Sequence, residues 1–82
     1  MFLDLNGNRM QTGNTSTMIF NVDTIVSYVS KFMSLQAGDI ITTGTPPGVG
    51  MGKKPQIFLK DGDNLELKID NLGQQNSKVV AI

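Results

Sequence analysis

The chain has 82 residues, a formal net charge of zero, no cysteine and no histidine. That length allows one small domain or part of a larger one, and disulfide scaffolds and zinc sites built on cysteine or histidine are excluded. The seven basic residues are scattered along the sequence, so no nucleic-acid or membrane-binding surface is expected. The absence of cysteine fits a cytoplasmic protein, and the sequence has neither a membrane-spanning apolar run nor a signal-peptide pattern.

Residues 1–12 are expected to form a β-hairpin. Asn6 and Gly7 match the favoured two-residue type I′ turn, in which both positions need a positive φ. A polar loop of small residues follows at 13–17. Its side chains are expected to satisfy the backbone of the loop itself.

One amphipathic helix is predicted from Val22 to Met33. Its apolar residues recur at helical spacing and form a single face: Val22, Ile25, Val26, Val29, Phe32 and Met33. Asn21 is placed to cap the first turn, where Asp23 also complements the helix dipole. Because valine and isoleucine are weak helix formers, packing must stabilise this helix. The apolar face is therefore interpreted as core rather than as a cofactor site.

The stretch Gly38–Gly52, GDIITTGTPPGVGMG, is the most informative part of the sequence. It predicts a turn and then a short strand that ends at Thr45, because Pro46 and Pro47 lack N–H donors. The glycines that follow permit backbone angles that other residues avoid: Gly48, Gly50 and Gly52. Such a strand end suits close approach to a small ligand. An ordinary strand-to-loop exit is the alternative interpretation.

The pattern L-x-x-G-D occurs twice, at 35–39 and 59–63, and predicts two strands that are entered through similar turns. The strand after the second copy alternates cleanly, which indicates one buried face and one solvent-facing face. Its apolar residues are Leu65, Leu67 and Ile69. A turn at 71–73 and a final apolar strand at 78–82 complete the prediction of a mainly β, α+β fold with one helix.

Known site motifs fail on spacing. A phosphate-binding loop ending at Gly52 and Lys53 would need a glycine at position 47 and a hydroxyl at position 54. A dinucleotide-binding fingerprint starting at Gly48 would need a glycine at Lys53. A calcium loop at 61–72 would need a glycine at 66 and an acid at 72. Without histidine or cysteine, a Ser/His or Cys/His catalytic pair cannot be built either.

Taken in order, several pieces of the sequence resemble the C-terminal part of the fumarylacetoacetate hydrolase family. The matching pieces are Asn6-Gly7, Gln11, Gly13-Asn14-Thr15-Ser16, Met18-Ile19-Phe20, the helix, Leu35-x-x-Gly38-Asp39, Thr43-Gly44-Thr45-Pro46-x-Gly48-Val49-Gly50 and Leu59-Lys60-x-Gly62-Asp63. The resemblance covers nearly the whole chain. It implies a mixed β-sandwich roll that binds Mg²⁺, Mn²⁺ or Ca²⁺. Family members cleave, decarboxylate, hydrate or isomerise small 2-oxo acids and β-diketones, and many are dimers, so a homo-oligomer is expected.

By position, the resemblance assigns Gly44 and Thr45 to the substrate pocket, where they would hydrogen-bond a keto or carboxylate oxygen. The metal ligands of the family are a Glu-x-Glu pair and a later Asp, all upstream of this segment. This chain has a single glutamate, Glu66, so no metal ligand and no catalytic residue is assigned to it. The resemblance then implies that Met1 is an internal start within a longer enzyme, or that the chain is a truncated relic.

The sequence is therefore interpreted as residues 1–82 of a C-terminal segment of a metal-dependent hydrolase, lyase or isomerase, inactive alone and supplying one wall of the substrate pocket. A truncated, non-catalytic β module that self-associates or pairs with another chain is the main alternative. A small-ligand binding protein that uses the loop at Thr45 is a third hypothesis. Because function lies in sites rather than in folds, the substrate is left open.

Overall fold

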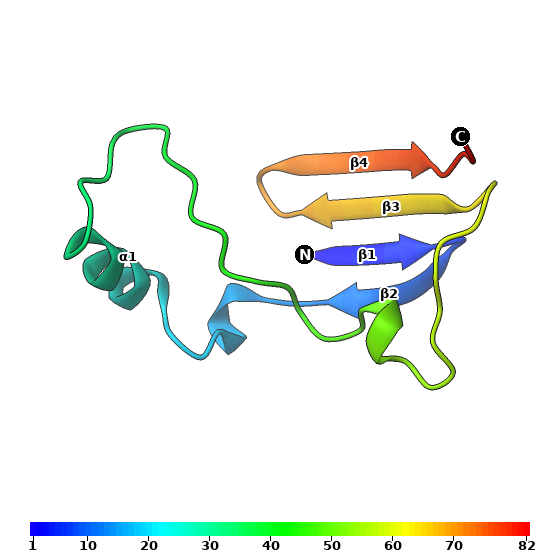
Figure 1. The fold of residues 1–82 in the computed structure, drawn as a ribbon, viewed down its shortest axis with the longest axis horizontal. Coiled ribbons are helices and arrows are strands. Elements are labelled where there is room, and N and C mark those ends of the chain that lie inside the picture. The colour runs from blue at the N-terminus through cyan, green and yellow to red at the C-terminus, as the bar shows by residue number, and fades with distance from the viewer. The chain divides into compact units, whose positions relative to one another are not determined.

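Four antiparallel strands form the sheet of this protein, seen in a computed structural model that describes all residues 1–82 (Figure 1). The strand order is β2-β1-β3-β4, which joins the N-terminal hairpin to the C-terminal hairpin. The strands are β1 (Phe2–Leu5), β2 (Asn8–Thr12), β3 (Asn64–Ile69) and β4 (Gly73–Lys78). The predicted class, mainly β with one helix, is confirmed, and the sheet of this chain is antiparallel throughout.

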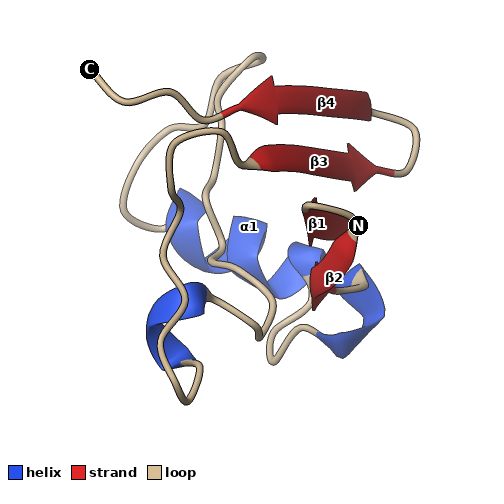
Figure 2. Cartoon of the chain, turned by 90° about the vertical axis from the view of Figure 1, so that its right-hand side faces the viewer, coloured by secondary structure: helices blue, strands red, loops and turns tan.

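The chain forms two compact units. One comprises residues 1–13 and 46–82 and contains the whole sheet, whereas the other comprises residues 14–45 and contains the helix α1 (Val22–Ser30). Much of the chain between β2 and β3 is loop, with two short 3₁₀ turns at Thr15–Thr17 and Gly50–Gly52 (Figure 2).

The predicted N-terminal hairpin is confirmed. Asn6 has φ 50° and Gly7 has φ 79°, which are the positive values that a type I′ turn requires. On the other side of β1, Leu3 lies opposite Leu67 and Leu5 opposite Leu65 of β3. The hairpin therefore supplies half of an apolar stripe that the C-terminal hairpin completes.

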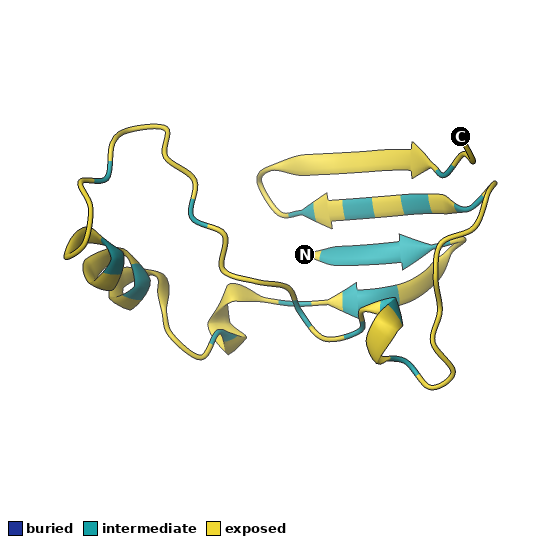
Figure 3. Cartoon of the chain, in the orientation of Figure 1, coloured by how far each residue is buried: buried dark blue, intermediate teal, exposed yellow.

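The two faces of the sheet differ in chemistry. Along β3, exposed and half-buried residues alternate, as the sequence pattern predicted (Figure 3). On the opposite face, Asp4 lies across from Glu66 and forms an ion pair with Arg9, whose guanidinium lies 3.9 Å from the centroid of the Phe2 ring. No residue of the chain is fully buried. The apolar stripe is thus only partly covered.

Two predicted strands are not formed. Residues 40–45 have no regular structure, and no ladder pairs them with another segment. The last strand is the polar segment Gly73–Lys78, whereas residues 79–82 lie beyond it. Residues 40–45 lack the partner backbone that a strand needs, and apolar composition alone does not supply one. Beyond β4, Val79 still exchanges backbone hydrogen bonds with Gly62 and Asp63, but no regular strand continues to the end of the chain.

The helix begins as predicted and ends earlier. The Asn21 side chain accepts a hydrogen bond from the Thr24 N–H at 2.8 Å, and Asp23 lies in the first turn. After Ser30 the chain continues as a turn in which Phe32 N donates to Val29 O. This hydrogen bond spans three residues, as in a 3₁₀ turn, which is common at helix ends. The Phe32 side chain remains 70% exposed.

The two L-x-x-G-D segments form the same turn. In the first, Asp39 N donates to Gln36 O and the Asp39 carboxylate accepts from Gln36 N, at 3.1 and 2.7 Å. In the second, Asp63 makes the same two bonds with Lys60, at 3.1 and 2.8 Å. The similarity of the turns is confirmed, but only the second leads into a strand.

Asp63 connects three parts of the sheet unit. Its Oδ1 accepts from Asn6 Nδ2 at 2.9 Å, and its backbone carbonyl accepts from Val79 N at 2.8 Å. Asn6 Oδ1 in turn accepts from Asn64 N at 2.9 Å. The hairpin turn, the start of β3 and the segment after β4 therefore meet at this one residue.

Stability at acid pH should depend on Asp63. Hydrogen bonds from the Asn6 side chain and the Lys60 backbone lower the pKa of Asp63 below its ordinary value of 3.8. Because its pKa is lower in the folded chain than in the unfolded chain, the Asp63 carboxylate stabilises the fold at pH values above the unfolded-state pKa. This contribution to the free energy of unfolding is lost as the pH falls through the folded-state pKa. We expect Asp63→Asn to flatten the decline of Tm below pH 4 relative to wild type. Asp70→Asn is the control, and parallel Tm curves for wild type and Asp63→Asn would contradict the expectation.

Candidate functional site

Gly44 and Thr45 end the stretch 40–45, at the boundary of the helix-bearing unit. Gly44 has φ 101°, a conformation that L side chains rarely adopt. Both residues are exposed, and both carry a backbone N–H, to which Thr45 adds a hydroxyl. The pair can therefore donate hydrogen bonds to an oxygen of a bound molecule, with no Cβ at Gly44 to obstruct it.

Pro46, the next residue, is held from two sides. Its carbonyl oxygen accepts a hydrogen bond of 2.7 Å from the side-chain amide of Gln11 on β2. A Cβ added to Gly13 would lie only 2.8 Å from Cγ of the Pro46 ring, so the ring occupies the space that a side chain at this position would need. No role was predicted for Gln11, because a glutamine in a strand carries no signal that its partner is a distant carbonyl.

The glycines after the prolines act through close packing. A Cβ on Gly48 would collide with the Met10 carbonyl oxygen, and one on Gly50 with the Ile57 carbonyl oxygen. The prediction that these glycines serve unusual backbone angles holds for Gly48, with φ 115°. It is wrong for Gly50 and Gly52, since neither has a positive φ.

An apolar pocket of about 230 Å³ lies between the 48–59 loop and the apolar stripe of the sheet. Its lining residues are Leu3, Leu5, Met10, Gln11, Gly48, Val49, Gly50, Met51, Ile57, Phe58, Leu59 and Leu65. Gln11 contributes the only side chain there with a hydrogen-bonding nitrogen or oxygen, and its amide donates to Pro46 O. A ligand site needs several convergent polar groups, so this pocket is interpreted as packing space beneath the loop.

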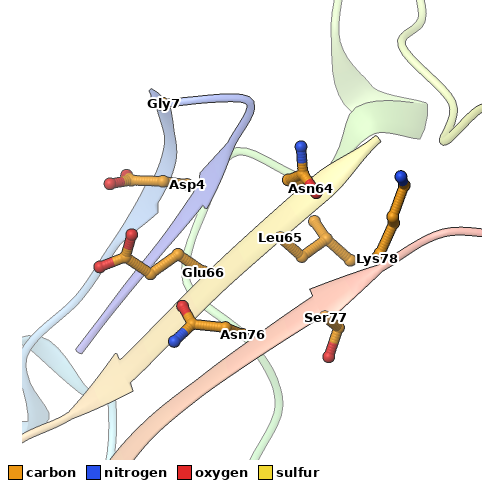
Figure 4. A pocket seen from close by; sticks show the side chains of 8 residues that line it. All are labelled: Asp4, Gly7, Asn64, Leu65, Glu66, Asn76, Ser77 and Lys78. Carbon is orange, nitrogen blue, oxygen red and sulfur yellow. The ribbon is translucent and has the colours of Figure 1, made fainter. Parts of the chain in front are cut away.

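A second depression, of about 300 Å³, lies on the polar face of the sheet (Figure 4). Asp4, Glu66 and Asn76 form a row across β1, β3 and β4 at its edge. Asp4 is paired with Arg9, and Glu66 accepts from Gln74 Nε2 at 2.9 Å. The Asp4 and Glu66 carboxylates are thus already partnered, and Glu66 and Asn76 are exposed to solvent, so the depression is interpreted as a solvated surface.

No three acidic side chains come together in the structure. Mg²⁺ and Ca²⁺ need several converging oxygen ligands, so the residues present do not fit the divalent cation that the resemblance implies. Asp39, Asp61 and Asp63 instead accept hydrogen bonds from backbone N–H groups. No chemical step through a metal can be assigned to this chain.

We therefore expect the isolated chain to bind no divalent cation tightly. Isothermal titration with Mg²⁺ and Mn²⁺ should give no heat beyond dilution, because the acidic residues are dispersed. The control is the same titration after Asp61→Asn and Asp63→Asn, which should be indistinguishable. Binding at micromolar concentration or tighter would contradict this expectation.

Comparison with known proteins decides the family. The sequence model described as "Fumarylacetoacetate (FAA) hydrolase C-terminal" matches residues 1–80. The chain belongs to the fumarylacetoacetate hydrolase family. It is 61% identical over 80 residues to 2,4-didehydro-3-deoxy-L-rhamnonate hydrolase of Sphingomonas sp. (strain SKA58), covering 96% of this chain and 28% of that protein.

Solved structures of the fumarylacetoacetate hydrolase family carry the same fold. A fumarylacetoacetate hydrolase from Exiguobacterium antarcticum superposes with a TM-score of 0.88 at 43% identity, over 99% of this chain and 29% of that one. A Mycobacterium smegmatis protein provisionally assigned as HpcE gives 0.90 at 40% identity, over 98% and 30%. The chain thus spans less than a third of these relatives. None of its helices has the length and apolarity needed to cross a membrane.

Proposed function

We propose that this chain is the C-terminal segment of a metal-dependent fumarylacetoacetate-hydrolase-family enzyme that acts on a small 2-oxo acid or β-diketone. In this proposal Gly44 and Thr45 line the substrate pocket. The cation, Mg²⁺, Mn²⁺ or Ca²⁺, and the catalytic residues are held by other parts of the enzyme. The chain by itself is inactive and resides in the cytoplasm.

The observation that carries the proposal is the 61% identity over 80 residues to a hydrolase. The name of that relative's substrate describes an acid with oxo groups at C2 and C4, which makes it both a 2-oxo acid and a β-diketone. The matching segment of this chain includes the stretch Thr43–Pro46. The donors of Gly44 and Thr45 suit an oxo or carboxylate oxygen, because such oxygens accept several hydrogen bonds.

A graft tests the proposal. The 80 matching residues of the Sphingomonas hydrolase are replaced by the matching residues of this chain, and hydrolysis of 2,4-didehydro-3-deoxy-L-rhamnonate is measured with added Mg²⁺ or Mn²⁺. We expect metal-dependent turnover from this graft and none from the isolated chain. If the graft does not fold, the remainder of the relative is co-expressed with this chain. A folded but inactive protein, or failure to fold in both formats, would overturn the proposal.

A truncated, non-catalytic β module that self-associates is the second candidate. The observation that favours it is the number of large apolar side chains left exposed, among them Ile19, Ile40, Leu72 and Val80, which are 94%, 88%, 81% and 69% exposed. The strand β4 also has a free edge, and free edges and apolar patches promote association.

Self-association of the isolated chain is therefore expected under either candidate. Analytical ultracentrifugation over a wide range of concentrations should detect dimers or larger species. The graft, in which the remainder of the relative is present, is the control and should form a species of defined size. A stable, well-folded monomer of the isolated chain at high concentration would contradict this prediction.

A further inference from the structure

We infer that Gln11 is a positioning residue for Thr45 in the substrate pocket. The inference rests on the proposed function of Thr45 and adds a residue to it. Gln11 lies on β2, 34 positions before Thr45 in the sequence. It acts through Pro46, which is covalently bonded to Thr45, so it is not itself a catalytic residue.

Two contacts fix Pro46 within the sheet-bearing unit. The Gln11 amide donates to the Pro46 carbonyl at 2.7 Å, and the Pro46 ring occupies the space that a side chain on Gly13 would need. Gly13 is anchored in turn, because its N–H donates to Met1 O at 3.0 Å. Pro46 is thus held by its carbonyl on one side and by its ring on the other.

The proline transmits this restraint to Thr45. The Pro46 ring fixes the φ angle of Pro46. Because the Pro46 carbonyl is also held by Gln11, the peptide between Thr45 and Pro46 has little freedom to move. The residue before a proline is also restricted to extended conformations. Together these restrictions narrow the positions available to the backbone of Thr45, from which its hydroxyl projects. A donor that is preorganised stabilises a developing charge without reorganisation during the reaction.

Packing alone does not account for a glutamine at this position. Gln11 lines the apolar pocket beneath the 48–59 loop, where every other side chain is apolar. Placing an amide among apolar groups is costly unless it forms hydrogen bonds. The bond to Pro46 is part-buried, which makes it stronger than the same bond in open water. Gln11 therefore fits the role of a fixed donor to the Pro46 carbonyl.

The test compares Gln11→Met with Gln75→Met in the graft. Both variants exchange an amide for a thioether of similar length, but Gln75 lies on the exposed edge strand β4. We expect Gln11→Met to lower kcat about fivefold to tenfold with little change in KM, the loss of roughly one hydrogen bond's worth of positioning. Gln75→Met should change neither. Gln11→Glu, which keeps the shape and removes the donor, serves if Gln11→Met fails to fold.

A double-mutant cycle with Thr45→Val separates positioning from general stability. If Gln11 acts through Thr45, Gln11→Met should reduce kcat less than twofold in the Thr45→Val background, because coupled residues are not additive. An equal loss in both backgrounds, or a lower Tm with unchanged kcat, would overturn the inference. An inactive unmodified graft would overturn the proposed function together with it. An active graft in which Gln11→Met behaves like Gln75→Met would overturn the inference alone.

Discussion

Replacing Thr45 with valine in the graft is expected to lower kcat/KM by roughly 5- to 150-fold while leaving Tm nearly unchanged. The reason is that valine keeps the β-branched shape of threonine and removes only the hydroxyl. A substrate oxygen in a desolvated pocket would lose one donor, which costs about 1–3 kcal/mol. The measurement is steady-state kinetics with thermal unfolding of the same samples.

The control for this change lies in the same segment. Thr42→Val makes the identical chemical replacement three residues earlier, at a position with no assigned role, and should leave kcat/KM unchanged. Under the interpretation that Thr45 merely leads into the loop, Thr45→Val would change stability within about 0.5 kcal/mol and would leave the rate unaffected. Equal kinetics of Thr45→Val and the unmodified graft would remove Thr45 from the site.

The second large effect is expected at Gly50. A Cβ added there would collide with the Ile57 carbonyl, and the hydrogen bond of 3.0 Å from Ile57 N to Gly50 O holds the two backbones together. Because the obstacle is backbone rather than a flexible side chain, the loop must move, and we expect Gly50→Ala to destabilise the graft by about 1–3 kcal/mol. Urea unfolding measures the difference.

Gly52 provides a matched control within the same 3₁₀ turn. Its added Cβ would meet only Val49 Cγ2, at 3.7 Å, which is an ordinary van der Waals distance. Neither glycine has a positive φ, so the two substitutions differ in steric contact rather than in backbone strain. Similar unfolding curves for Gly50→Ala and Gly52→Ala would show that the close approach to Ile57 does not constrain this loop.

The local features of the fold followed from the sequence. The Asn6-Gly7 turn, the Asn21 cap, the alternation in β3 and the two L-x-x-G-D turns each depend on residues within a few positions of one another. Their physical causes, which are positive φ, side-chain capping and period-two burial, act over that same range. The order of the family motifs was also sufficient to identify the family before any geometry was known.

The tertiary structure decided what depends on distant partners. The polar segment Gly73–Lys78 forms the last strand, β4, because its backbone pairs with that of β3. Residues 40–45 pair with no other segment and form no strand. The tertiary structure also revealed that Gln11 holds the Pro46 carbonyl and that Gly50 is required by Ile57. Each of these features depends on a backbone group of another segment, such as the carbonyls of Pro46 and Ile57, and a backbone group carries no residue-specific signal from which the sequence could predict the contact.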